Sequence, residues 1–453
     1  MGNGEMKLNR YPKYKPTGIA WLPEVPEGWE VRRGKYLLIQ KLESCQRGVK
    51  VGLENIESCS GKYLPTASSF EGGGVAFKPG DILYGKLRPY LAKAWLAEFT
   101  GNAVGDFYVY SPAEAFYGRY ALYWLLSKPF TDVCTVSAYG AKMPRVSSHF
   151  ISSLSFPLPP LAEQRAIVAF LDEKCGKIDR WVAAKEREVA LLKELKQAMI
   201  AEAVTRGVRA ISRVEVEKWR KSGLPGSGAE PQIYTSTPLH GSNPRPLVPS
   251  GIPWLPEVPE GWEVLRNKTF LKLTDEKVGD RKSEFVLLSL TKQGVIIRDL
   301  TEMKGKFPKD FDTYLVVRPD NLVFCLFDVD ETPRTVGLVR NVGMLTGAYT
   351  NFEVDTTKVL PEFAYYFYLH VDDAKKLRPY YTGLRKVVKT STFLQLRMPV
   401  PPLAEQRAIV AYIEARAAKI DAAVAGLERE VAAMKEYKQR LIADVVTGQR
   451  KVA

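Results

Sequence analysis

An eleven-residue sequence that occurs twice is the feature that most constrains how this chain can fold. The sequence PPLAEQRAIVA begins at Pro159 and again at Pro401, at an offset of 401 − 159 = 242 residues. The likeness continues downstream, because the pattern KIDxxVAxxEREVAxxKExKQxxIAxxVT fits both 177–205 and 419–447. An internal repeat of this length indicates two copies of one structural unit.

Each copy of the repeat predicts a long helix. Two prolines precede it, and Glu163 and Gln164 fall in the first turn, near the positive end of the helix dipole. Beyond Lys177 the apolar residues follow a 3.5-residue period over four heptads, which is typical of a coiled coil. If a two-fold axis relates the copies, the two helices pair antiparallel. The predicted seam residues are Ile178, Val182, Val189, Leu192, Lys196 and Met199 in the first copy and Ile420, Val424, Leu427, Val431, Met434, Lys438 and Leu441 in the second.

Two details of these helices allow more than one interpretation. Lys196 and Lys438 occupy the same seam position, where a polar residue can fix the register of the pair. The alternative is a lysine that extends from the seam edge into solvent. The first copy also has Gly176 where the second has alanine. A glycine inside a helix costs about 1 kcal/mol relative to alanine, so a break at this place is favoured more in the first copy than in the second.

A second repeat precedes each globular region. GIAWLPEVPEGWEV at 18–31 returns as GIPWLPEVPEGWEV at 251–264. Its prolines and glycines predict an irregular leading loop. We expect its four tryptophans to pack onto the domain, and stacking on nucleic-acid bases is the alternative. These tryptophans are Trp21, Trp29, Trp254 and Trp262.

The regions between the repeats read as mixed α/β domains. In the first, period-two patterns predict strands over 80–87 and 103–110, and an apolar run predicts a buried helix over 116–126. The second follows the same outline, with TGLRKVVK at 382–389 in the place of AYGAKMPR at 138–145. The predicted fold is therefore two tandem α/β (α+β) domains separated by long helices, which form an antiparallel coiled coil if pseudo-two-fold symmetry relates the copies. The expected segments are a tail at 1–17, a domain at 18–158, a helical spacer at 159–208, a Pro/Gly/Ser-rich linker at 209–250, a second domain at 251–398 and a second spacer at 399–453.

The charge of the chain points to a polyanionic partner. The net charge is +14 with a pI near 9.3, although such an excess can also serve solubility alone. Residues 1–158 carry 19 basic against 13 acidic side chains, and 251–398 carry 22 against 20. No apolar run reaches membrane-spanning length and no apolar signal core begins the chain, so we expect a cytoplasmic protein. The five cysteines form no CxxC pair and predict reduced thiols.

Motifs for common enzyme chemistry are missing from the sequence. It contains no GxxxxGK[ST] phosphate loop, no GxGxxG turn and no HExxH pair. A nuclease interpretation could cite Asp320 with Asp373 and Lys375, but these carboxylates lie more than fifty residues apart. The sequence therefore predicts a binding protein without catalytic residues, metal or cofactor.

Basic residues interleaved with aromatic ones in loops are the candidates for nucleic-acid contact. Phosphate contacts position such a protein and base-edge contacts specify sequence, and arginine suits guanine. The alternative for each is a solvated surface charge or a packed tyrosine. The candidates are Lys86, Arg88, Tyr90, Tyr139, Lys142 and Arg145 in the first domain and Arg334, Arg340, Tyr349, Arg385, Lys386 and Lys389 in the second.

The repeated segments resemble one known family. The tandem WLPEVPEGWEV segments, with PLPPLAEQRAIVAFLDEK and PVPPLAEQRAIVAYIEAR, resemble the specificity subunit of Type I restriction–modification systems over nearly the whole chain. The resemblance implies two target-recognition domains, each reading one half of a split, asymmetric site in double-stranded DNA. It implies an antiparallel helix pair that sets the gap between the halves and binds two copies of a modification methyltransferase subunit.

The resemblance also implies a division of labour between subunits. Methyl transfer from S-adenosylmethionine would belong to the methyltransferase, and ATP- and Mg-dependent translocation and cleavage to restriction subunits, with this chain non-catalytic. Three alternatives remain open. The chain could be an orphan DNA-binding or regulatory protein, or a coiled-coil scaffold that binds only proteins. The third, a self-contained modification enzyme, is disfavoured because no cofactor loop is present.

Overall fold

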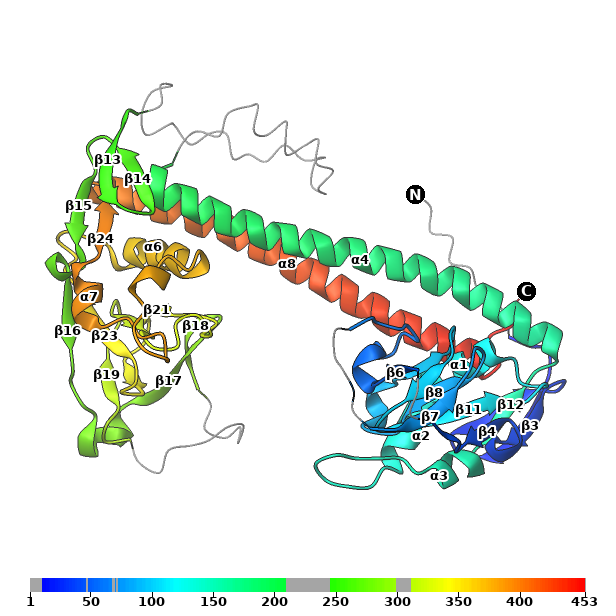
Figure 1. Cartoon of the computed structure of the whole chain (residues 1–453). Coiled ribbons are helices and arrows are strands. Elements are labelled where there is room, and N and C mark those ends of the chain that lie inside the picture. Colours follow the sequence, from blue (N-terminus) through cyan, green and yellow to red (C-terminus); the bar gives the residue numbers. More distant parts are fainter. Residues whose placement is uncertain are drawn as a thin grey trace. The chain divides into compact units, whose positions relative to one another are not determined.

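A computed structural model of the chain describes residues 10–45, 48–66, 70, 72–208, 245–298 and 311–452 (Figure 1). The chain forms two compact units, each described here by itself. The first comprises Met1–Glu186 with Glu428–Ala453, and the second comprises Arg187–Leu427. Each unit therefore contains a β-rich domain together with part of α4 (Leu161–Arg206) and part of α8 (Leu403–Val446).

The domain of the first unit is built on two four-stranded sheets. Its strands are β1 Tyr14–Ile19, β2 Leu22–Pro26, β3 Glu30–Arg33, β4 Leu38–Lys41, β5 Ser44–Cys45, β6 Val49–Val51, β7 Gly74–Phe77, β8 Ile82–Gly85, β9 Ala94–Leu96, β10 Gly101–Ala103, β11 Phe107–Pro112 and β12 Ser155–Leu158. One sheet has the antiparallel order β4-β11-β8-β9, and the other has the order β5-β7-β10-β6 with β10 and β6 parallel. β1 pairs with β2, and β3 pairs with β12.

Short helices complete this domain. They are α1 Gly118–Leu126, α2 Lys128–Val136 and α3 Ser148–Ser153, with 3-10 turns at Gly34–Tyr36, Leu53–Asn55 and Pro89–Leu91. α1 is buried continuously from Tyr120 to Leu126, as its uniformly apolar sequence predicts. The predicted helix is thus confirmed, and Figure 1 shows it beside the sheet that contains β8.

The second unit repeats this frame with changes in one sheet and in the helices. Its strands are β13 Leu247–Ile252, β14 Leu255–Pro259, β15 Glu263–Arg266, β16 Leu271–Thr274, β17 Val286–Thr291, β18 Gly294–Ile297, β19 Leu315–Val317, β20 Leu322–Phe324, β21 Val336–Leu338, β22 Gly343–Leu345, β23 Thr350–Val354 and β24 Arg397–Val400. The sheet β16-β23-β20-β21 matches β4-β11-β8-β9. In the other sheet, β18-β17-β22-β19, the fourth strand lies beside β17, whereas in the first unit β5 lies on the opposite edge, beside β7. The helices are α6 Pro361–Asp373 and α7 Thr390–Gln395, with 3-10 turns at Asn267–Thr269, Gly279–Glu284 and Arg378–Tyr380.

Both long helices are anchored in the core of each domain. In the first unit, Leu171 of α4 and Val445 of α8 are buried in the same apolar cluster as Trp124. In the second unit, Val204 of α4 and Ile413 of α8 occupy the equivalent cluster. The beginning of one helix and the end of the other therefore share one core in each unit.

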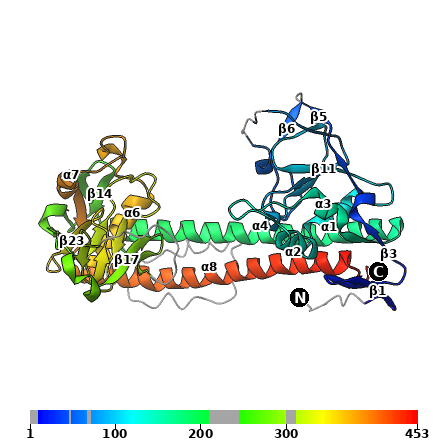
Figure 2. The same cartoon turned by 90° about the horizontal axis from the view of Figure 1, so that it is seen from below.

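The two helices run antiparallel within each unit. In the first, Lys438 of α8 donates to Asp179 of α4 at 2.6 Å, and Lys435 donates to Glu186 at 2.8 Å. Residue numbers thus rise along α4 while they fall along α8. Figures 1 and 2 show the two helices side by side. The predicted antiparallel coiled coil is confirmed, whereas the two-fold relation of the units stays a prediction.

The predicted seam residues are buried or half-buried throughout. Val182, Val424, Val431 and Leu441 are buried, and the remaining predicted seam positions are half-buried. The predicted break at Gly176 was wrong, because α4 is one uninterrupted 46-residue helix. A cost of about 1 kcal/mol for one glycine is small beside the burial of neighbouring α4 residues in the domain core.

The predicted leading loop was also wrong. In each unit it folds into a β-hairpin, β1–β2 and β13–β14, followed by a third strand. A two-stranded ribbon consists only of edges, where the missing N–H of proline is tolerated. The tryptophans pack as predicted: Trp29 is 1% exposed, and the rings of Trp21 and Trp124 lie 5.9 Å apart.

Other boundaries differ from the expected ones. β1 begins inside the expected tail at 1–17, and β13 begins inside the expected linker, whose residues 209–244 lie outside the described residues. The expected strand over 103–110 is two strands, β10 and β11, because Gly105 turns the chain with a φ of +82°. Among the described residues, no helix is both long and apolar enough to span a membrane.

Candidate nucleic-acid interface

The glutamine of the repeated motif joins each long helix to its domain. Gln164 is buried, and its Oε1 accepts a hydrogen bond from the backbone N–H of Tyr117 at 2.8 Å. Its Nε2 donates to the carbonyls of Ala115 at 2.9 Å and Pro159 at 2.8 Å. The side chain thereby satisfies backbone groups before α1 and before α4 at once.

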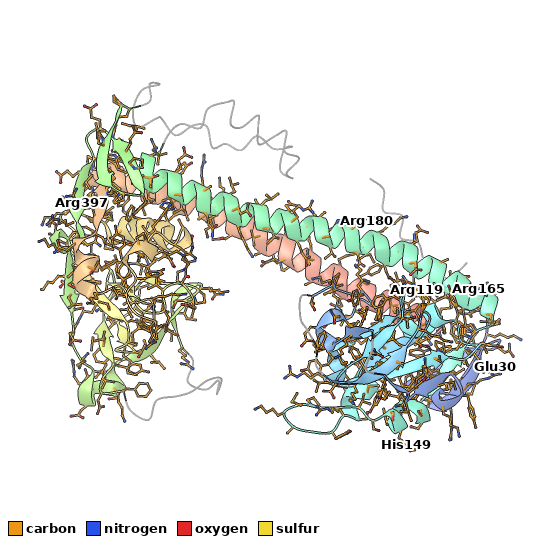
Figure 3. All side chains as sticks on the ribbon, viewed as in Figure 1. Glu30, Arg119, His149, Arg165, Arg180 and Arg397 are labelled. Atoms are coloured by element: carbon orange, nitrogen blue, oxygen red, sulfur yellow. The ribbon has the colours of Figure 1, made fainter. Side chains whose placement is uncertain are left out.

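The second unit repeats this arrangement with Gln406. Its Oε1 accepts from the N–H of Leu360 at 2.7 Å, and its Nε2 donates to Lys358 at 3.0 Å and Pro401 at 2.8 Å. The repeated motif therefore fixes the direction in which each helix leaves its domain. In the first unit an ion pair adds to this joint, because Arg119 of α1 reaches Asp172 of α4 at 2.9 Å (Figure 3).

In the first unit, backbone hydrogen bonds bring two candidate segments together. Arg88 donates its N–H to the carbonyl of Pro144 at 2.7 Å, and Val146 donates to Lys86 at 3.1 Å. Tyr139 and Arg145 exchange two backbone hydrogen bonds. The segment after β8 and the loop before α3 therefore form one surface. On it lie the predicted residues Lys86, Arg88, Tyr139, Lys142 and Arg145, with Tyr90 in the adjoining 3-10 turn.

The charges on this surface are only partly compensated. Asp106, in the turn between β10 and β11, accepts from Nε of Arg145 at 3.1 Å and from its Nη2 at 3.0 Å. Lys86 lies 3.7 Å from the same carboxylate. The bond from Arg145 lowers the pKa of Asp106 and raises the pKa of Arg145 itself. Among the described residues, Arg88 and Lys142 have no acidic partner.

The second unit joins its corresponding loops in the same way. Asp328 donates its N–H to the carbonyl of Arg385 at 2.7 Å, and Val388 donates to Leu326 at 2.8 Å. Asp328 follows β20 as Arg88 follows β8, and both have positive φ, 46° and 50°. At this place in the common frame, the two units thus present side chains of opposite charge.

An aromatic stack supports the loop of the second unit. The rings of Tyr349 and Phe327 lie parallel within 14°, with centroids 6.4 Å apart, and Cζ of Arg385 lies 5.1 Å from the Phe327 centroid. Arg385 also donates from Nε and Nη2 to Asp328, at 3.4 Å and 2.6 Å. The neighbouring Leu384 is fully exposed. This loop therefore presents an arginine that is held on two sides.

Most of the predicted cations of the second unit have acidic partners. Lys386 pairs with Glu331 and, at 3.3 Å, with Asp330. The hydrogen bond to Glu331 contributes most to raising the pKa of Lys386. Lys389 is exposed, and among the described residues it has no acidic partner. This cluster is thus closer to neutral than that of the first unit, in agreement with the charge counts.

Two predicted residues of the second unit do not join the loop cluster. Arg340 pairs with Glu362 at 2.8 Å, near the start of α6, and Arg334 pairs with Asp373 at 3.3 Å, at its end. The side chain of Arg334 is only 19% exposed. The structure therefore brings together Tyr349, Arg385, Lys386 and Lys389, whereas Arg340 and Arg334 pair with acidic residues at the two ends of α6.

The acidic partners of these arginines and lysines were not predicted from the sequence. Asp106 is an isolated residue in a turn and gives no signal. The run DVDE at 328–331 is visible in the sequence and could have suggested a partner for Arg385 and Lys386. Phe327, which carries the stack, was not among the predicted residues.

The residues of the nuclease interpretation serve other contacts. Lys375 pairs with Asp372 at 3.0 Å, Asp373 pairs with Arg334, and Asp320 lies 4.0 Å from Arg340. Within the described ranges, no three His, Cys, Asp or Glu side chains gather as metal ligands would.

Comparisons with known proteins point to one family. The family described as Type I restriction modification DNA specificity domain matches residues 92–179. The chain is 28% identical over 204 residues to the Type I restriction enzyme EcoDI specificity subunit of Escherichia coli, covering 43% of this chain and 45% of that protein. It is 21% identical over 326 residues to the MjaVIII specificity subunit of Methanocaldococcus jannaschii, covering 69% and 66%. The matches thus span less than two thirds of either relative.

The fold itself matches a solved structure over most of its length. A chain solved in work on complex assembly and conformational transition of the type I R-M system has a TM-score of 0.64 and 17% identity, and the match covers 93% of this chain and 98% of that one. Both curated relatives are named specificity subunits. By these comparisons the chain is similar to specificity subunits of Type I restriction enzymes, and the family match lies inside the first unit.

Proposed function

We propose that this chain is the DNA-recognition subunit of a Type I restriction–modification complex and that it binds a split, asymmetric site in double-stranded DNA. The observation that carries the proposal is the pair of loop clusters, one on each domain. The two clusters lie at matching places in one frame, and both contain arginine, lysine and exposed or stacked tyrosine. Lysine and arginine side chains in such loops can contact phosphates, and side chains held in a fixed orientation can contact base edges.

The difference between the clusters supports two unlike half-sites. Arg88 stands in the first domain where Asp328 stands in the second. The first domain also has the larger positive excess. We expect the first domain to make more phosphate contacts and the second to depend more on shape and hydrogen bonding.

The long helices are the proposed docking surface for two copies of a modification methyltransferase subunit. Leu191 and Leu195 of α4 and Tyr437 of α8 lie outside the seam and are exposed, and exposed apolar residues of this kind suit a protein partner. S-adenosylmethionine would bind the methyltransferase, and ATP with Mg would bind restriction subunits if the complex contains them. This chain contributes recognition without catalysis, in the cytoplasm where the DNA lies.

Methylation-sensitive sequencing tests the proposal. The chain is expressed with its methyltransferase, and methylated positions across the genome are mapped. We expect one motif with two different halves separated by a fixed gap. Methylation without such a motif contradicts the proposal. A chain that forms no complex with a methyltransferase but binds DNA in a strongly salt-dependent way would indicate an orphan DNA-binding protein. A chain that binds no DNA would indicate a protein scaffold.

A further inference from the structure

The same side-chain arrangement occurs once in the loop cluster of each domain. Arg145 uses Nε and Nη2 to hold Asp106, and Arg385 uses the same two nitrogens to hold Asp328. The aspartates come from different elements, since Asp106 lies between β10 and β11 and Asp328 follows β20. The arrangement therefore does not come from a repeated sequence motif, although the contact between arginine and aspartate is similar in the two domains.

Each aspartate leaves one edge of its arginine available. A guanidinium has a side edge, formed by Nε and Nη2, and an end edge, formed by Nη1 and Nη2. The aspartate occupies the side edge. Among the described residues, Nη1 of Arg145 and of Arg385 has no acceptor. The end edge thus presents two parallel N–H donors whose direction is already set.

The charge of the pair favours a base over a phosphate. A carboxylate beside the guanidinium cancels much of its attraction for a phosphate and would repel one that approached closely. The N7 and O6 atoms of guanine are neutral acceptors side by side in the major groove, and they match two parallel donors. Adenine offers an acceptor and a donor there, so one N–H of the arginine would face another N–H.

We propose that Arg145 and Arg385 each read a guanine through the Nη1–Nη2 edge, so that each half of the recognised site contains a G·C pair. Asp106 and Asp328 are positioning residues that hold the two guanidinium groups in place. The stack of Arg385 on Phe327 gives the second arginine a further restraint. The inference rests on the proposed function and assigns a specificity-determining residue to each domain.

The test uses the complete complex of this chain with its methyltransferase. The wild-type methylome gives the motif, and binding to duplexes with each base pair replaced in turn gives the preference at every position. The variants Arg145→Lys and Arg385→Lys keep the charge but lose the fork. We expect each to reduce discrimination for guanine at one position, in one half of the site only, by about 5- to 150-fold. The other half serves as the internal control for folding.

The positioning residues give a second, independent readout. In Asp106→Asn and Asp328→Asn the arginine remains, but its partial neutralisation and one of the two acceptor oxygens that orient it are lost. We expect weaker discrimination for guanine together with tighter binding to unrelated DNA, since a negative charge has been removed. The matched control is Arg88→Ala, whose side chain has no acidic partner among the described residues. It should weaken binding to all sequences alike and reduce the salt slope by about one.

Two results would overturn the inference while leaving the proposed function intact. One is a split wild-type motif with no G·C pair in one of its halves. The other is an arginine-to-lysine variant that methylates the unchanged motif with unchanged discrimination at every position. A wild-type complex that methylates no motif would overturn the proposed function and, with it, this inference.

Discussion

Lys438 reaches across the helix pair and donates a hydrogen bond to Asp179 at 2.6 Å. The repeat equivalents of these residues, Lys196 and Asp421, form the same bond at 2.7 Å. Each helix therefore supplies one aspartate and one lysine to these bonds. Asp179 and Lys196 come from α4, and Asp421 and Lys438 come from α8. Of the two interpretations of the seam lysines, the structure favours the one in which they link the helices at a defined register, because neither ammonium simply extends into solvent.

Replacing Lys438 should destabilise the first unit more than replacing Lys196 destabilises the second. The side chains of Lys438 and Asp179 are 13% and 32% exposed, whereas those of Lys196 and Asp421 are 30% and 60% exposed. Because solvent screens the second pair more, we expect Lys438→Ala to cost about 1–2 kcal/mol and Lys196→Ala about 0.5 kcal/mol. Urea unfolding of the two variants measures the difference. Equal costs would show that burial does not distinguish the pairs.

The stability of the first unit should fall in acid partly through Asp179. Burial raises the pKa of this carboxyl, but hydrogen bonds from Lys438 and Lys62 outweigh burial, and the net pKa is lowered. A lowered pKa in the folded state stabilises the protein above the ordinary carboxyl pKa of about 3.9, and this contribution is lost as the pH falls through the lowered value.

The variant Asp179→Asn isolates this contribution. Unfolding free energies measured between pH 7 and pH 2 should differ most between wild type and variant near neutral pH. The two curves should approach each other in acid, where the wild-type carboxyl is also uncharged. A difference that stays constant over the whole range would mean that Asp179 acts through packing rather than charge.

The helices and their pairing could be predicted because their signal is local and repeated. A pattern of four heptads in each copy determines which face is buried, and the antiparallel pairing was predicted on the assumption that a two-fold axis relates the two copies. The hairpins were missed because Pro16 and Pro23 suggest a loop, although a two-stranded ribbon can hold them. The strand pattern could not reveal that the fourth strand of one sheet changes edge between the units.

The candidate site was predicted only in part, for a similar reason. Arginine and tyrosine in a loop are visible in the sequence, and Arg145 and Arg385 were predicted. Their aspartates were not, because Asp106 is separated from Arg145 by 39 residues and Asp328 from Arg385 by 57. Such pairs are fixed by the approach of two loops, which depends on the strand order and not on any local pattern.

The buried glutamines of the repeated motif should be far more important for stability than exposed ones. Gln164→Ala leaves the N–H of Tyr117 and two carbonyls without their partner, and unsatisfied buried groups of this kind cost about 2–4 kcal/mol in sum. Gln197, exposed on α4, is the matched control, and its change to alanine should cost less than about 0.5 kcal/mol. Thermal unfolding of both variants tests this, and similar melting temperatures would contradict it.

Glycines in and after the long helices should respond oppositely to alanine. Gly176 lies inside α4, and a Cβ there would meet only Nη1 of Arg180 at 3.7 Å, so Gly176→Ala should stabilise the chain by about 0.5–1 kcal/mol.

Gly448 follows α8 with a φ of +75°, and a Cβ there would lie 2.4 Å from Pro26 of the leading hairpin. Gly448→Ala should therefore destabilise the first unit, by about 1–3 kcal/mol, through both backbone strain and the clash. Denaturant unfolding of the two variants measures these opposite shifts. A stabilised Gly448→Ala variant would show that the hairpin does not pack against the end of α8.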